Sequence, residues 1–211
     1  MINTTIVGYG EMIPSSMKTY IERLEQHLSS YYPAISWRIY DVKMKKGAMS
    51  ELRQHLGKKV LSYHPNIIFI RLSSQDIDIE RGDFVGKACL ENYLSELLEE
   101  MIGHNNRTGL NNCIPIPIVI TPPPIHEKME RRGRTNNRLQ QYIYALKQVA
   151  LAKKSIVIDL YGEINKKLNK EKYILEEGYG LTQEGENLLY DLSFIELTRL
   201  IDYQGVIKNR E

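Results

Sequence analysis

The segment most informative about the fold is His64-Pro65-Asn66-Ile67-Ile68-Phe69-Ile70-Arg71-Leu72-Ser73-Ser74-Gln75-Asp76. Its centre, residues 67–70, consists of four apolar residues in succession, three of them β-branched. A short apolar run with turn-forming residues beside it is typical of a strand buried on both faces of a parallel sheet. The polar residues that follow, from Ser73 to Asp76, are therefore expected at the carboxyl end of a central strand.

Four more runs rich in β-branched residues predict strands, and amphipathic helical periods lie between and after them. Strand and helix alternate along the chain, which implies βαβ crossovers with helices on both faces of a mostly parallel sheet. No composition shift or internal repeat marks a boundary, so residues 1–211 are predicted to form a single α/β domain. The predicted strands span residues 4–8, 36–42, 66–72, 114–121 and 155–160.

The net charge and the cysteine content indicate which partners and which cellular compartment suit this chain. The 28 Lys and Arg residues against 26 Asp and Glu residues leave a net charge of +2, so no global field favours nucleic acid or an acidic membrane. Cys89 and Cys113 have no metal-like spacing, which fits a reducing compartment. The residues after Met1 lack signal-peptide features, and no stretch approaches 18 apolar residues. We expect a cytoplasmic protein with no membrane association, no metal and no cofactor.

Four segments at expected element ends follow the order and spacing of one known family's sequence blocks. They are Gly8-Tyr9-Gly10-Glu11, Gly47 ahead of the second helix, Ser73-Ser74-Gln75-Asp76, and Glu177-Gly178-Tyr179-Gly180-Leu181-Thr182-Gln183-Glu184-Gly185. In this order the chain resembles the SGNH/GDSL hydrolase superfamily of GDSL-like lipases and acylhydrolases. The resemblance implies one three-layer, doubly wound domain whose five-stranded sheet has the flavodoxin-like order 2-1-3-4-5.

The resemblance also implies where a catalytic triad would lie, and the sequence departs from the family there. In the family a serine attacks an ester carbonyl, a histidine accepts its proton and an aspartate orients the histidine. Carried over by position, the nucleophile becomes Gly10, the base Gly180 and the orienting acid Glu177. Gln75 replaces an oxyanion-binding asparagine, and its extra methylene moves the donor by more than about 1 Å. The sequence therefore predicts a degenerate family member.

Three residues are candidates to replace the lost groups. Ser73 and Ser74 follow the third strand, where their main expected role is to cap the turn. His126 follows a run of three prolines and could lean over the crevice at the sheet edge. The crevice at the carboxyl ends of the strands is predicted to be lined by Gly8, Tyr9, Gly10, Glu11, Gly47, Ser73, Ser74, Gln75, Asp76 and Tyr179.

The loop at residues 126–138 is basic, with five Lys and Arg residues against two Glu residues. Guanidinium groups suit phosphate or carboxylate recognition, so Arg131, Arg132 and Arg134 are candidates for an anion site. Binding of a nucleic-acid backbone through this loop is a further alternative. The sequence has no recognition-helix signature to support it.

Three functions follow from these observations. The leading hypothesis is a catalytically inactive domain that binds an unidentified small ligand in the crevice, or a protein partner at a tyrosine-rich surface, since the chain holds 14 Tyr but only three Phe residues. The second is a divergent hydrolase of esters or acetyl groups with relocated catalytic residues. The third is an anion or nucleic-acid-backbone binder.

Overall fold

The computed structural model contains one sheet of five strands, all parallel, in the order β2-β1-β3-β4-β5. The predicted fold class and strand order are thereby confirmed. The structure describes residues 2–11, 17–44, 48–80, 84–103, 107–109, 112–127, 133–176 and 180–201. The strands are β1 (Ile2–Glu11), β2 (Ile35–Met44), β3 (Ile67–Arg71), β4 (Ile116–Ile120) and β5 (Ile156–Ile158).

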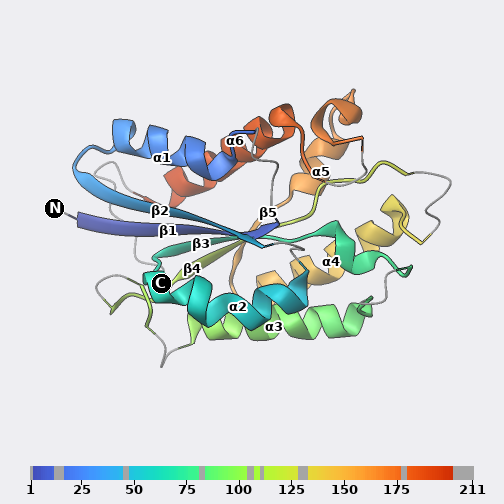
Figure 1. Ribbon diagram of the computed structural model, residues 1–211, viewed down its shortest axis with the longest axis horizontal. Coiled ribbons are helices and arrows are strands. Elements are labelled where there is room, and N and C mark those ends of the chain that lie inside the picture. The colour runs from blue at the N-terminus through green and yellow to red at the C-terminus, as the bar shows by residue number, and fades with distance from the viewer. Residues whose placement is uncertain are drawn as a thin grey trace.

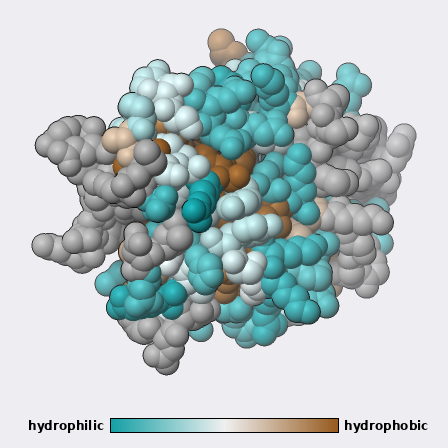
Figure 2. Space-filling model, turned by 60° about the vertical axis from the view of Figure 1, so that its left-hand side comes forward, coloured by the Kyte–Doolittle hydropathy of each residue, from teal (hydrophilic) through white to brown (hydrophobic). Residues whose placement is uncertain are grey.

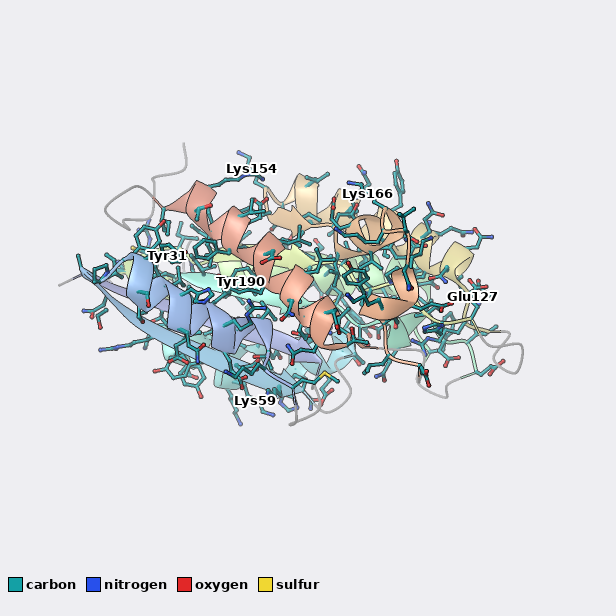
Figure 3. The ribbon with its side chains drawn as sticks, turned by 90° about the horizontal axis from the view of Figure 1, so that it is seen from above. Tyr31, Lys59, Glu127, Lys154, Lys166 and Tyr190 are labelled. Carbon is teal, nitrogen blue, oxygen red and sulfur yellow. The ribbon has the colours of Figure 1, made fainter. Side chains whose placement is uncertain are left out.

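Helices cover both faces of the sheet (Figure 1). One face carries α1 (Tyr20–Tyr31), the short α5 (Leu160–Asn165) and α6 (Gln183–Leu200). The opposite face carries α2 (Met49–Lys59), α3 (Lys87–Ile102) and α4 (Asn136–Ala152). Figure 3 shows α1 and α6 side by side above the sheet, with Tyr190 between them.

Strand β3 divides its side chains between two cores because successive residues point to opposite faces. Ile68 and Ile70 pack with α2, α3 and α4, whereas Ile67 and Phe69 pack with α1 and α6. All four side chains are fully buried. Burial of each such side chain stabilises the fold by about 1.5–3 kcal/mol, so this strand anchors both layers.

Side-chain caps define where the helices begin. Thr19 accepts a hydrogen bond from the N–H of Glu22, and the Glu22 carboxylate accepts from the N–H of Thr19, which completes a capping box at α1. Thr182 caps α6 by accepting from the N–H of Gly185. Asp159 caps α5 by accepting from the N–H of Gly162 at 3.1 Å. These caps fix the register of the helices that approach the carboxyl end of the sheet.

No helix among the described residues is both long and apolar enough to span a membrane. On the face seen in Figure 2, hydrophilic atoms predominate, and hydrophobic atoms gather in smaller areas near its centre. Two short 3₁₀ helices matter for the site, η2 (Ser74–Ile77) after β3 and η4 (Lys170–Tyr173) after α5.

Candidate functional site

Gly10, to which the resemblance assigns the nucleophile, lies inside a strand and has no room for a side chain. Gly10 belongs to β1 and pairs with Arg71 of β3. A Cβ atom on Gly10 would lie 2.5 Å from the carbonyl oxygen of Arg71 and 2.8 Å from its Cβ. The φ angle of Gly10 is +157°, which also disfavours other residues. Backbone packing therefore explains glycine here.

The prediction that Gly8 and Tyr9 line the crevice is wrong. The α carbon of Gly8 faces α1, because a Cβ there would lie 2.5 Å from Cγ1 of Ile21. Tyr9 points to the other face, where its ring is buried in the core and its hydroxyl donates to the carbonyl of Leu52. Burial, together with the negative charges of Glu51 and Glu100, raises the pKa of the Tyr9 hydroxyl. Tyr9 is thus a core residue and no nucleophile.

A buried ion pair fills the space beside Gly10 on the α1 and α6 side. Arg71 continues the face of Ile67 and Phe69, and its Nη1 lies 2.7 Å from Oε1 of Glu186 in α6. The two side chains are 3% and 0% exposed. The second carboxylate oxygen of Glu186 accepts from the N–H of Tyr20 at 3.2 Å. The pair therefore joins β3, α6 and the start of α1.

Asp41 adds a second, partly buried carboxyl to this face. It pairs in register with Gly8, and its Oδ2 lies 3.6 Å from Nζ of Lys43. Burial raises the pKa of Asp41, and the opposing effects of Lys43 and of a hydrogen bond from Thr19 are smaller. The folded chain therefore binds this proton more tightly than the unfolded chain, so ionised Asp41 lowers the stability of the folded state.

We expect Asp41→Asn to raise the free energy of unfolding at neutral pH. The gain should be absent in acid, grow as the pH rises above about 4, and become constant above the raised pKa of the folded chain. Urea unfolding of both proteins across this range checks the prediction. A variant that is less stable at neutral pH would mean that the contacts with Lys43 and Thr19 outweigh burial.

The segment after β3 is held by structural hydrogen bonds. The Ser73 hydroxyl accepts from the N–H of Gln75 and caps η2. The Ser74 hydroxyl accepts from Nη2 of Arg134 at 2.7 Å, and both side chains are buried. The Asp76 carboxylate accepts from the N–H of Met49 at 3.2 Å, which caps α2 because Ala48 has no side-chain acceptor. Gln75 is half-buried beside them.

The prediction that Arg134 binds an anionic ligand is wrong, since only 4% of this residue is exposed and its guanidinium donates to Ser74. Gly180, to which the resemblance assigns the base, has a φ angle of +88°, and its carbonyl accepts from the N–H of Leu175. The other predicted positions, Gly47, Arg131, Arg132, Glu177 and Tyr179, and the side chain of Glu11, lie outside the described residues.

An open cleft lies between the loop after β4 and the segment that contains α5 and η4. Its volume is about 790 Å³. His126 lies in its wall, as does Glu127, which Figure 3 labels at the end of the molecule where the strands finish. The described lining residues are Pro124, Ile125, His126, Glu127, Asn136, Asn165, Leu168, Asn169, Lys170, Glu171 and Ile174.

Internal hydrogen bonds fix the shape of this cleft. Asn136 accepts from the N–H of Ile125 at 2.9 Å and donates to its carbonyl at 2.8 Å, so α4 holds the loop. Asn165 donates to the carbonyl of Tyr161 and accepts from Nζ of Lys170, so α5 holds η4. The cleft is therefore built from two braced segments. Leu168 is fully exposed on its rim.

A second, smaller cleft of about 430 Å³ adjoins the first at Asn165, between α4 and α5. An ion pair of Lys147 with Asp159, 2.7 Å long, crosses it, and Tyr144 and Tyr161 supply aromatic walls. Burial alone would raise the pKa of Asp159, but hydrogen bonds from Lys147 and from the N–H of Gly162 hold it below its ordinary value. Asp159 thus stays ionised as part of the wall.

Sequence reasoning missed most of the cleft and the buried ion pair. The loop after β4 was recognised by its prolines and its place after a strand, and this includes His126. The opposite wall comes from residues 165–174, which have no helical period long enough to predict an element. A signal for the ion pair was present, since Arg71 is a lone charge in an apolar strand.

Comparison with known proteins identifies the fold. No protein-family model matches the chain, and a search of curated protein sequences finds no match. A lipase/acylhydrolase from Enterococcus faecalis superposes with a TM-score of 0.76 at 19% identity, over 99% of each chain. An acetylxylan esterase from Geobacillus stearothermophilus superposes with a TM-score of 0.71 at 17% identity, over 99% of this chain and 97% of the esterase. The chain therefore has the same three-layer α/β fold as this lipase/acylhydrolase and this acetylxylan esterase.

Proposed function

We propose that this chain is a catalytically inactive domain of the SGNH hydrolase fold that binds a small, hydroxyl-rich ligand. The observation that carries the proposal is the packing at Gly10. Its α carbon lies against the Arg71 backbone, so the nucleophile position admits no hydroxyl side chain. The open cleft beside His126 supports a binding role, because it offers a concave surface of about 790 Å³ outside the packed strands.

The alternative of a hydrolase with relocated residues finds less support. Among the described residues that line the cleft, none is a serine, threonine or cysteine that could serve as a nucleophile near His126. Ser73 and Ser74 are buried, and their hydroxyl oxygens accept hydrogen bonds from the N–H of Gln75 and from Arg134. Burial of Arg134 likewise weakens the alternative of a nucleic-acid backbone at the basic loop.

The chemistry of the cleft indicates the ligand class. The cleft is lined by amide and carboxylate groups and by the aliphatic side chains of Ile125 and Leu168. Such groups donate and accept hydrogen bonds with hydroxyls, while the aliphatic surface packs against the less polar face of a sugar ring. Among the described lining residues, the carboxylates Glu127 and Glu171 outnumber the one lysine, Lys170, which disfavours a phosphate as the ligand. The similar fold of an acetylxylan esterase makes xylo-oligosaccharides a reasoned first probe.

Titration of the protein with xylotriose and with acetylated xylotriose, followed by NMR chemical shifts, tests the binding role. We expect saturable shifts at the cleft and a roughly tenfold weaker affinity in His126→Ala, which removes one hydrogen-bonding group. Lys166→Gln is the matched control, because Lys166 is exposed nearby, paired with Glu163 and outside the cleft lining. The assignment of ligand class would be overturned if neither sugar caused chemical-shift changes. It would also be overturned if Lys166→Gln lost as much affinity as His126→Ala.

A further inference from the structure

The two clefts share a braced wall. Asn165 lines both of them. Its side chain donates to the carbonyl of Tyr161 at 3.0 Å, and the Tyr161 hydroxyl donates to the carbonyl of Asn136 at 3.3 Å. Tyr161 lines the second cleft and Asn136 lines the first, so one series of hydrogen bonds runs from one cleft into the other. The clefts are therefore adjoining parts of one groove.

The charges in the second cleft balance each other. Among the described residues that line it, the charged ones are Lys147 and Asp159, which pair at 2.7 Å and are both partly exposed. An anion would have to compete with Asp159 for the lysine, so this cleft suits an uncharged ligand better than a phosphate or a carboxylate. The first cleft likewise disfavours a phosphate, and the two clefts thus select the same kind of ligand.

The polar groups of the second cleft suit the hydroxyls of a sugar ring. The Lys147 ammonium has further N–H donors besides the one that Asp159 accepts, and the Asp159 carboxylate is an acceptor. Neighbouring hydroxyls on a sugar ring can accept from such an ammonium and donate to such a carboxylate at the same time. The exposed amide of Gln140 adds a donor and an acceptor to the same cleft.

Aromatic rings from two helices complete this cleft. Tyr144 of α4 and Tyr161 of α5 both line it, and Tyr144 is 68% exposed. An exposed ring gains free energy when a ligand covers it, because apolar surface leaves water. The C–H groups on one face of a sugar ring can cover an aromatic ring while the hydroxyls at its edge reach Lys147 and Asp159.

We propose that the ligand is an oligosaccharide that binds along the whole groove, with one segment in the first cleft and the next segment against Tyr144 in the second. This inference rests on the proposed binding function and adds to it the length of the ligand. The two segments are covalently joined, so binding of the first holds the second at a high effective concentration. Affinity should therefore rise when the sugar is long enough to reach Tyr144.

A comparison of xylotriose with xylohexaose by NMR titration tests this inference. We expect xylohexaose to bind about tenfold more tightly than xylotriose. Tyr144→Ala should remove this gain and change the affinity for xylotriose by less than about twofold. Tyr144→Phe keeps the ring and should retain most of the gain. Tyr31→Ala is the matched control, because Tyr31 is 66% exposed on α1, over the other face of the sheet (Figure 3).

The outcomes distinguish this inference from the binding function on which it rests. If xylotriose binds but xylohexaose binds no more tightly, the second cleft takes no part and the inference is overturned while the binding function stands. Equal losses of affinity for both sugars in Tyr144→Ala, or an equal loss of the gain in Tyr31→Ala, would also overturn it. If neither sugar binds, the binding function and the inference both fail.

Discussion

Glu186→Gln is expected to destabilise the folded chain by about 3–5 kcal/mol, because it removes one charge of a buried ion pair with Arg71. Arg71 is 3% exposed and Glu186 fully buried, so water cannot replace the lost carboxylate. The same substitution weakens the bond from the N–H of Tyr20 at the start of α1. Urea unfolding monitored by circular dichroism measures the change.

Two further variants separate this effect from side-chain loss in general. Glu196→Gln breaks an ion pair with Arg199 that lies on the surface of the same helix, and should change stability by about 1 kcal/mol or less. The double variant R71M/E186L replaces the buried pair with apolar groups and should regain most of the loss. Equal effects of Glu186→Gln and Glu196→Gln would contradict the role given to the buried pair.

Gly10→Ser is expected to destabilise the chain by about 2–4 kcal/mol, because the new Cβ meets the Arg71 carbonyl and the backbone angle is unfavourable. The double variant G10S/G180H, which places a serine and a histidine at the positions that the resemblance assigns to catalysis, is therefore expected to fold poorly and to show no esterase activity. Thermal unfolding together with an ester assay measures both outcomes.

Gly86→Ser is the matched control for this substitution. Gly86 is the N-cap of α3, and a Cβ there would meet no atom within 4 Å. Serine is a favoured N-cap, so we expect unchanged or slightly higher stability. A stable G10S/G180H protein that hydrolyses esters would mean that the strand at Gly10 can rearrange and that the scaffold has kept its catalytic geometry.

The fold could be predicted from sequence because its decisive signals are local. The apolar run at residues 67–70 predicts a strand buried on both faces, and the structure buries all four side chains. The short α5 was missed, since six residues hold too few periods to predict a helix. The strand order was predicted from the family resemblance and the parallel pairing from the alternation of strands and helices. The structure confirms the order and the parallel pairing.

The candidate site was harder to predict because it depends on side-chain direction and on distant partners. Tyr9 was placed in the crevice by its position at a strand end, yet the alternation of β1 turns its ring into the core. The guanidinium of Arg134 suits an anion site by its chemistry. In the folded chain it donates instead to Ser74, which lies 60 residues away in the sequence. The Asp159 cap on the N–H of Gly162, by contrast, joins residues three apart in the chain, and such a local contact can be indicated by sequence alone.

The proposal that this chain does not hydrolyse esters is tested most directly by incubating the purified chain with p-nitrophenyl acetate and following p-nitrophenolate release. We expect no release above that of the heat-denatured protein, either as an initial burst or at steady state. Release of p-nitrophenolate that scales with the amount of folded protein and disappears in His126→Ala would contradict the proposed inactivity. It would mean that this fold holds a working nucleophile and base.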